Sequence, residues 1–235
     1  MFSESAELYD LIYGAFKDYP AEVDRVAGIV RDLHPDARTI LDVACGTGEH
    51  ASLLRERHGF GVDGVDLDPA MVRIAAAKNP AGAFHVADMT DFSLSRAYDV
   101  VTCLFSSIGY ARTLAGVQRT LAAFARHLAP GGVMLVEPWF EPGVLQAGRI
   151  SLKSVERDGI SVTRMTHLAV DGRISRLRFD YLVGTADGIR HASETHELGI
   201  FTREEMLAAF AAADLAATYD ASGLSDRGLY LARPH

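Results

Sequence analysis

The sequence predicts an α/β protein with a doubly wound, mostly parallel sheet of seven strands and a four-stranded antiparallel sheet inserted after the fifth strand. Short apolar strands alternate with helical patterns from residue 39 to residue 137. This alternation is typical of a parallel sheet covered by helices on both faces. Between residues 150 and 200, three Asp-Gly pairs separate segments of strand-like composition, and Asp-Gly is a strong signal for a hairpin turn.

The elements of the first part follow from the hydrophobic pattern. Two helices precede the first strand, and Pro20 is a good first-turn residue for the second of them. The pattern predicts helices at 5–16, 20–33, 48–58, 69–78 and 114–128 and strands at 39–44, 60–66, 83–87, 98–104 and 132–137. The last of these strands is almost entirely apolar, which suits a strand covered on both faces.

The insert reads as a meander of four antiparallel strands. In "RLRFDYLV" apolar side chains alternate with polar ones, as in a strand with one buried face. A helix at 202–213 follows, with Thr202 and Glu205 at capping-box spacing, and strands near 215–221 and 227–233 complete the sheet. We therefore predict one domain, divided into N-terminal helices (1–34), a cofactor-binding core (39–137), the insert (150–200) and a closing segment (201–235).

Composition excludes several classes of protein. The chain is 49% hydrophobic and 23% charged, which is ordinary for a folded protein. No apolar run approaches the roughly 20 residues of a membrane helix, and the acidic N-terminus lacks the features of a signal peptide, so we expect a cytoplasmic protein without membrane contact. A net charge of −8 argues against a nucleic-acid partner. The two cysteines and the histidines show no metal-ligand spacing, and we expect no metal.

The charge is unevenly distributed. Residues 149–191 carry eight basic and five acidic side chains, an excess of three positive charges, so the rest of the chain carries −11. The basic excess could be a solvated strand surface, or it could attract an anionic substrate.

The stretch "TILDVACGTGEHASLL", residues 39–54, marks the candidate ligand site. Its strand, glycine turn and helix form the arrangement with which a backbone binds a nucleotide cofactor. The spacing Asp42-x-Ala44-x-Gly46-x-Gly48 differs from the G-x-G-x-x-G of dinucleotide-binding proteins. Because Ala44 carries a Cβ, we expect a negative φ at that position.

Acidic residues at the ends of three strands identify the nucleotide. Asp66 lies 18 residues after Gly48 and can accept hydrogen bonds from both hydroxyls of a ribose. Asp88 ends the third strand, where an adenine would lie, and Asp42 is placed to hold a cationic group. Such a cluster repels a pyrophosphate but suits an adenosine compound with a positive charge, and S-adenosylmethionine fits that description.

At these residues the sequence resembles the class I methyltransferases, which share the "LDVACGTG" turn, the "VDLD" strand end and the "ADM" stretch. The resemblance implies that Asp66 binds the ribose and that Asp88, with Met89, binds the adenine amino group. The stretches "YDLIYGAFKDY", "CLFSSIGY", "FARHLAPGG", "VEPWF" and "RGLY" are similar to the sugar N-methyltransferases of antibiotic pathways, over essentially the whole chain. That similarity implies methylation, usually twice, of the amino group of a nucleotide-linked (TDP) deoxysugar.

Two other functions stay open. A methyltransferase could act on another small amine or on a natural-product hydroxyl. A binding or regulatory module could hold S-adenosylmethionine without using it, although the intact turn, Asp66, His127 and Tyr13 argue against this.

Two residues are candidates for catalysis. His127, at the end of a helix, could accept the proton of the amine, or it could cap the helix and pair with its dipole. Tyr13 could lie close to the sulfonium and the amine, or it could serve helix packing. Tyr9, Tyr13 and Lys17 share one helical face, so this helix could cover the cofactor and exclude water, or it could be an amphipathic surface helix.

The remaining candidates for substrate binding are residues that come directly after strands and arginines, most of them from the basic part of the insert. The serines after the fourth strand lie at the ligand edge of the sheet or cap the next segment; Trp139 stacks on the ligand or packs under the insert. Arg164, Arg176, Arg178 and Arg227 could bind a pyrophosphate or be surface charges. The predicted cofactor contacts are Tyr9, Tyr13, Lys17, Asp42, Ala44, Gly46, Gly48, Asp66, Leu67, Asp88, Met89 and Phe105. The predicted substrate contacts are Ser106, Ser107, Trp139, Arg164, Arg178 and Arg227. A homodimer that covers the strands of the insert is expected.

Overall fold

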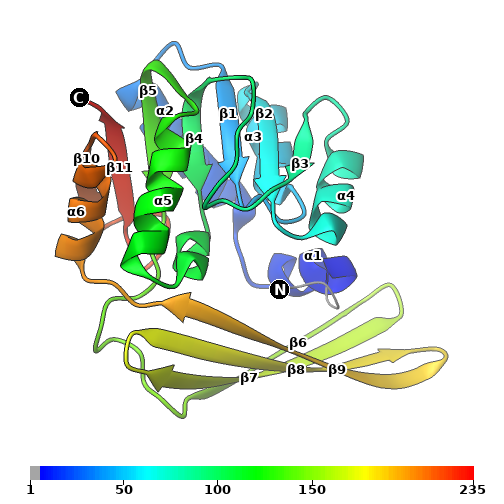
Figure 1. Cartoon of the computed structure of the whole chain (residues 1–235). Helices are drawn as coiled ribbons and strands as arrows, with labels where there is room; N and C mark the ends of the chain where they lie inside the picture. Colours follow the sequence, from blue (N-terminus) through cyan, green and yellow to red (C-terminus); the bar gives the residue numbers. More distant parts are fainter. Residues whose placement is uncertain (1–5) are drawn as a thin grey trace.

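The computed structural model describes residues 6–235, and its strands form two sheets (Figure 1). The first sheet contains β1 (Thr39–Val43), β2 (Gly61–Asp66), β3 (Phe84–Val86), β4 (Tyr98–Cys103), β5 (Leu128–Val136), β10 (Leu215–Asp220) and β11 (Leu229–Pro234). The second contains β6 (Ile150–Arg157), β7 (Ile160–Asp171), β8 (Ile174–Thr185) and β9 (Gly188–Gly199). The helical elements are η1 (Ala6–Leu8), α1 (Tyr9–Gly14), α2 (Tyr19–Leu33), α3 (Glu49–His58), α4 (Pro69–Lys78), η2 (Ser107–Ala111), α5 (Leu114–Ala125) and α6 (Arg203–Ala212).

The first sheet has the strand order β10-β11-β5-β4-β1-β2-β3. β11 pairs antiparallel with β10 and β5, and all the other strand pairs of this sheet are parallel. The predicted fold class, including the insert after the fifth strand, is confirmed. β1 pairs with β2 on one side and with β4 on the other. The strand order therefore reverses at β1, and such a switch point is where ligands bind in open α/β sheets, at the carboxyl ends of the strands.

Both faces of this sheet are buried. In β1, Ile40 packs into the apolar cluster formed with α2 and α3, whereas Leu41 packs into the cluster formed with α5 and α6. Successive side chains of a strand point to opposite faces. Helices on both sides therefore explain why the core strands are apolar runs rather than alternating ones. Among residues 6–235 no helix is long and apolar enough to cross a membrane.

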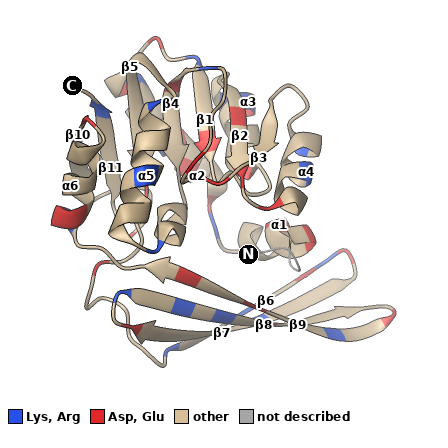
Figure 2. Cartoon of the chain, viewed as in Figure 1, with Lys and Arg blue, Asp and Glu red and all other residues tan. Residues whose placement is uncertain are grey.

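The four strands of the second sheet are joined by the three Asp-Gly turns that the sequence predicted. At the turn between β6 and β7, Asp158 and Gly159 both have positive φ, at 53° and 77°, as a type I′ hairpin turn requires. One face of this sheet packs on α1 and the other is open (Figure 1). Figure 2 shows Lys and Arg positions along β7 and β8, and Asp and Glu positions on the core strands above them.

Three boundaries differ from the prediction. β5 begins at Leu128, opposite Tyr98 of β4, so the Pro-Gly-Gly stretch lies inside the strand as an irregularity rather than before it. Consequently α5 ends at Ala125 instead of residue 128. At the N-terminus, Ser5 of the predicted helix lies outside the described residues, and the rest splits into η1 and α1, which ends at Gly14.

Candidate cofactor and substrate site

The loop between β1 and α3 forms the centre of the site. Ala44, Gly46 and Gly48 all have positive φ, at 57°, 55° and 73°. The expectation of a negative φ at Ala44 is therefore wrong. A left-handed conformation costs a residue with a Cβ roughly 1–2 kcal/mol, and the turn imposes it here. A Cβ on Gly48 would lie 2.7 Å from Nδ2 of Asn79, so only glycine lets α3 begin this close to α4.

Asp66, at the end of β2, fixes this turn. Its Oδ2 accepts a hydrogen bond from the backbone N–H of Gly46 at 2.8 Å, and its Oδ1 accepts one from the N–H of Asp68 at 2.9 Å. Burial raises the pKa of the Asp66 carboxyl despite these hydrogen bonds. The carboxylate predicted to bind a ribose thus lies directly beside the glycine turn.

Asp42 supplies a second buried carboxylate. Its Oδ1 accepts a hydrogen bond from Oγ1 of Thr102 at 2.9 Å, whereas its buried Oδ2 has no hydrogen-bond partner among residues 6–235. Burial, with a contribution from the charge of Asp66, raises the pKa of the Asp42 carboxyl. An unpaired buried carboxylate is costly, and a cationic ligand would offset that cost. These two acidic residues therefore fit the sulfonium cofactor predicted from the sequence.

A cavity of about 30 Å³ lies next to Asp42. Its walls include Tyr9 of α1, the glycine turn, and Phe105 and Ser107 after β4. This volume holds only a few water molecules, and the cavity continues into open solvent. The helix α1 is the wall that lies outside the core (Figure 1).

Polar contacts hold α1 over the glycine turn. Asp10 accepts hydrogen bonds from Oγ1 of Thr47 at 2.5 Å and from Nζ of Lys78 at 2.7 Å. Lys78 also donates to Glu49 at the start of α3, at 2.6 Å. We call these four residues the α1 clamp. They connect α1 to α3 and α4 across the cavity, as expected of a cover.

The three residues predicted to share a face of this helix separate in the structure. Tyr9 faces the cavity, whereas the hydroxyl of Tyr13 accepts a hydrogen bond from Nη1 of Arg164 in the second sheet at 2.9 Å. Lys17 lies beyond the end of α1, where it pairs with Glu22, and burial lowers its pKa. Its Nζ lies 4.5 Å from the centroid of the Phe105 ring. All three remain near the site, but only Tyr9 lines the cavity.

The segment after β4 has two consecutive residues in the left-handed region. Phe105 and Ser106 have φ values of 53° and 62°. The N–H of Phe105 donates to Oε2 of Glu137 at 2.6 Å, and the hydroxyl of Ser106 donates to the carbonyl of Pro138 at 2.6 Å. Ser106 is buried and its hydroxyl serves this loop, which favours the alternative that it stabilises the segment after β4; its role in substrate binding stays a prediction. Ser107 does line the cavity.

No sequence pattern pointed to Glu137, whose carboxylate holds several groups at this edge of the sheet. Its Oε1 accepts hydrogen bonds from Ser225 at 2.6 Å and from Nη2 of Arg227 at 2.8 Å. Arg227 is thereby placed at the ligand edge, with its guanidinium committed to Glu137. Trp139 also has a structural partner, since its indole N–H donates to Oγ of Ser175 at 2.8 Å. This bond favours the interpretation that Trp139 packs under the insert.

The structure contradicts the catalytic role predicted for His127. Its Nε2 accepts a hydrogen bond from the N–H of Leu94 at 2.8 Å, and its Nδ1 lies 2.7 Å from the carbonyl of Ala123, so both ring nitrogens bond to backbone. The ring is buried and stacks on Phe92. His127 precedes β5 and therefore lies at the amino ends of the parallel strands, whereas the cavity lies at their carboxyl ends.

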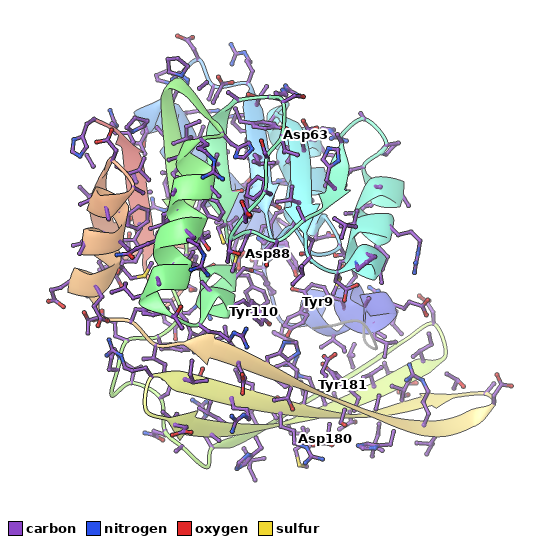
Figure 3. All side chains as sticks on the ribbon, in the orientation of Figure 1. Tyr9, Asp63, Asp88, Tyr110, Asp180 and Tyr181 are labelled. Atoms are coloured by element: carbon purple, nitrogen blue, oxygen red, sulfur yellow. The ribbon has the colours of Figure 1, made fainter. Side chains whose placement is uncertain are left out.

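Arg178 is also misassigned. It alternates with the inward-facing Phe179 and Tyr181, is 60% exposed, and pairs with Asp180 at 3.0 Å. Figure 3 shows Asp180 on the side of the second sheet that faces away from the core. Arg176 lies on the same outer face, paired with Glu197 at 2.9 Å. Neither arginine can reach a ligand between the sheets.

The last residues predicted to contact the cofactor are Asp88 and Met89, expected at the adenine, and Leu67. Asp88 accepts hydrogen bonds from the N–H and the hydroxyl of Thr90, each at 2.8 Å, and Leu67 is 50% exposed. Met89 packs against the apolar core. Figure 3 shows Asp88 on the same side of the core as Tyr9, whereas Asp63 lies toward the opposite end. The adenine contacts stay predictions.

No sequence pattern indicated the partly buried chain of polar side chains between the two sheets. The hydroxyl of Tyr110 lies 2.8 Å from Nδ1 of His196, and Nε2 of His196 lies 3.4 Å from Oε1 of Glu194. The hydroxyl of Tyr181 donates to the same oxygen of Glu194 at 2.6 Å. Tyr110 belongs to η2 and the other three to the second sheet, so no local pattern could reveal their association.

Comparison with known proteins agrees with this geometry. Residues 40–132 match a family model described as a methyltransferase domain. The chain is 42% identical to the dTDP-3-amino-3,6-dideoxy-alpha-D-glucopyranose N,N-dimethyltransferase of Streptomyces fradiae, over 98% of this chain and 91% of that protein. It matches the crystal structure of DesVI from Streptomyces venezuelae with a TM-score of 0.92 and 39% identity, over 98% of both chains. It also matches CalS10 with S-adenosylmethionine bound, an amino pentose methyltransferase from Micromonospora echinaspora, with a TM-score of 0.83 and 40% identity over 93% of this chain and 92% of that chain.

The matches to the Streptomyces fradiae enzyme and to DesVI extend over both sheets. Together with a glycine turn flanked by Asp42 and Asp66, they identify both the cofactor and the family. The chain belongs to the class I S-adenosylmethionine-dependent N-methyltransferases, within the group that contains the TDP-amino-sugar N,N-dimethyltransferases.

Proposed function

We propose that this enzyme methylates, twice in succession, the amino group of a TDP-linked deoxy amino sugar in antibiotic biosynthesis. One observation carries the proposal. A pocket with two cationic side chains lies under α1, next to the acidic cofactor site. The names of the similar proteins support the same substrate class. A small amine or a natural-product hydroxyl is the alternative acceptor, but neither would need a site for phosphates.

The pocket is formed by α1, β6 and β7. Lys153 and Arg164 lie directly opposite each other across these strands and both face α1. Like charges directly opposite in a sheet are destabilising, and among residues 6–235 neither side chain forms an ion pair. Arg164 is buried, and its Nε has no hydrogen-bond partner in the described part of the chain. An anion between these cations would remove their repulsion, and a diphosphate matches the donors of Arg164.

Phe16 completes the pocket. Its ring centroid lies 4.8 Å from Nζ of Lys153 and 5.7 Å from the guanidinium carbon of Arg164. The ring is 41% exposed and offers a face on which a thymine could stack. The pocket therefore combines the two features that a TDP group requires.

The mechanism follows from these positions. S-adenosylmethionine supplies an activated methyl group when it is bound. Asp66 and Asp42 hold its ribose and its positive charge, and Lys153 and Arg164 hold the diphosphate, so the sugar lies between two fixed points. Such alignment supplies roughly 7–11 kcal/mol of the barrier. The α1 clamp excludes water, the competing nucleophile.

A panel of acceptors tests this function. We expect TDP-linked 3-amino and 4-amino deoxysugars, incubated with S-adenosylmethionine, to gain the mass of one and then two methyl groups. The same amino sugars without TDP serve as the control and should react far more slowly, because they lack the anchoring diphosphate. Methylation of free amines with no effect of TDP, or methylation of hydroxyl acceptors alone, would reject the proposal.

We also propose that the enzyme is a homodimer joined through the outer face of the second sheet. Five large apolar side chains are exposed on that face: Ile150, Leu152, Met165, Leu182 and Ile189. Their exposed fractions range from 47% to 79%, and exposed apolar side chains gathered on one face of a sheet are typical of an interaction surface.

Sedimentation equilibrium tests the dimer. We expect a dimer for the wild type and a monomer for Met165→Asp, because the charge would be buried in the contact. Val144→Asp is the matched control, since Val144 is equally exposed, at 56%, but lies in the loop after β5. A wild-type monomer at micromolar concentration would disprove the contact.

A further inference from the structure

Tyr110, His196 and Glu194 form a polar chain that runs from η2 into the second sheet, with His196 buried and Tyr110 exposed in part. η2 is a 3₁₀ helix, in which residues three apart lie on the same side. Ser107 lines the cofactor cavity, and Tyr110, one turn further along η2, interacts electrostatically with Tyr9, another wall of that cavity. Figure 3 shows Tyr110 between the core and the second sheet, at the level of Tyr9.

Close packing fixes the chain against η2. A Cβ on Gly109 would lie 3.0 Å from Cδ2 of Leu198, so a larger residue here would force Leu198 of β9 to shift by a few tenths of an ångström. Glu194, His196 and Leu198 alternate along β9 and face the core together. The contact that Gly109 permits therefore brings the Tyr110 hydroxyl to His196.

We propose that Tyr110 and His196 form a proton relay that takes the proton from the substrate ammonium before each methyl transfer. This inference rests on the proposed amino-sugar substrate. A protonated amine has no lone pair with which to attack a methyl group, so the proton must leave first. His127, the residue predicted as a base from the sequence, lies at the opposite edge of the sheet and is not placed to accept it.

The hydrogen bonds define the direction of the relay. When the Tyr110 hydroxyl donates to Nδ1 of His196, the proton of the neutral imidazole is on Nε2, which faces Glu194. The ammonium N–H bond breaks and its proton goes to the oxygen of Tyr110. The original hydroxyl proton moves to Nδ1 of His196. The amine is then neutral, Tyr110 is again a phenol, and the positive imidazolium lies next to the Glu194 carboxylate.

The surroundings of Tyr110 favour a hydroxyl that passes a proton on. Burial, followed by repulsion from neighbours that include Glu194 and Asp66, raises the pKa of Tyr110 well above its usual value. The phenol therefore keeps a proton at neutral pH and does not act as a tyrosinate base. Among residues 6–235, the titratable groups that interact electrostatically with Tyr110 include Tyr9, Tyr13, Glu194, Asp66 and Tyr181, and Glu194 also lies against His196.

A pH profile of two variants tests the relay. At pH 7 the neutral fraction of an aliphatic amine is roughly 0.1 when its pKa is about 8 and roughly 0.0004 when its pKa is about 10.4. Tyr110→Phe and His196→Gln should therefore lower kcat at pH 7 by about 10-fold to 1000-fold, with the Kd for S-adenosylmethionine unchanged. Since the amine loses its proton to solvent at higher pH, the gap to the wild type should close by about tenfold per pH unit.

A second measurement requires no cofactor. In ¹⁵N spectra of histidine-labelled protein, adding a TDP-amino sugar alone should shift the ring-nitrogen resonances of one histidine, assigned to His196 by its absence in His196→Gln. The change should not occur in Tyr110→Phe. The control variant is Tyr98→Phe, which removes a buried hydroxyl bonded to Asp63 at the far end of the sheet and should match the wild type in both experiments.

Each outcome decides the question. Wild-type kcat at pH 7 in Tyr110→Phe, a loss that persists unchanged to about pH 10, or an unchanged His196 spectrum would each overturn the relay. Should His196→Gln fail to fold, Tyr110→Phe decides, because phenylalanine preserves the ring at a position that is 37% exposed. If the wild type methylates no TDP-amino sugar, the proposed function fails instead.

Discussion

Arg164→Met is expected to raise the KM for a TDP-amino sugar by about 100-fold or more, while the Kd for S-adenosylmethionine stays within about twofold. A hydrogen bond to a charged group contributes about 1.5–3 kcal/mol, and two such bonds from one guanidinium to a diphosphate contribute at least about 3 kcal/mol, or a factor of about 150. Kinetics with the TDP-linked and the free amino sugar measure the effect, which should be confined to the TDP-linked substrate.

Arg178→Met is the matched control, with the same substitution in the same sheet. Because Arg178 lies on the outer face and pairs with Asp180, its loss should leave the KM within about twofold of the wild type. Thermal melting confirms that both variants are folded. Equal effects of the two substitutions would show that the basic excess of the insert acts as a diffuse charge, and the pocket under α1 would then not be the diphosphate site.

Asp42→Asn is expected to stabilise the protein without cofactor and to weaken cofactor binding. In the folded state burial holds the pKa of Asp42 above its unfolded value. The folded protein therefore binds this proton more tightly, and stability falls as the pH rises from the unfolded pKa, near 4, through the raised folded pKa. At neutral pH the charged Asp42 is thus a cost, which asparagine removes.

Calorimetry measures both effects. We expect a gain of about 1 kcal/mol in the free energy of unfolding, or about 2–4 °C in Tm, and a loss of about 10-fold to 100-fold in affinity for S-adenosylmethionine. Asp180→Asn is the control, and it should not raise the free energy of unfolding, because hydrogen bonding to Arg178 lowers the pKa of that exposed carboxyl and favours its charged form. A lower Tm for Asp42→Asn without cofactor would contradict this prediction, because it would mean that the charged Asp42 does not destabilise the folded protein.

The fold could be predicted because its signals are local. Apolar runs, Asp-Gly turns and the Thr202 capping box each depend on a few neighbouring residues, and the capping box is present with both of its hydrogen bonds. The acidic site could be predicted for the same reason. Carboxyl ends of neighbouring parallel strands meet at one edge, so Asp42 and Asp66 had to converge.

The site predictions fail where the position of a residue depends on the edge of the sheet or on the face of the strand on which it lies. His127 precedes a parallel strand, and that topology alone places it at the edge opposite the ligands. The alternation within β8 likewise assigns Arg178 to the outer face, since Phe179 and Tyr181 fill the inner one. The pairing of Tyr110 with His196 joins residues 86 positions apart. No period or motif records a contact between η2 and β9.

The position of α1 links the two ligands of the enzyme. Tyr9, at the start of this helix, borders the cofactor cavity, whereas Ile12 of the same helix and Phe16, just beyond its end, border the pocket with Arg164. A movement of α1 that releases spent cofactor would therefore also remove a wall from the nucleotide pocket. Processivity would suffer in consequence: the monomethylated sugar would be free to diffuse away between the two transfers and would have to rebind for the second.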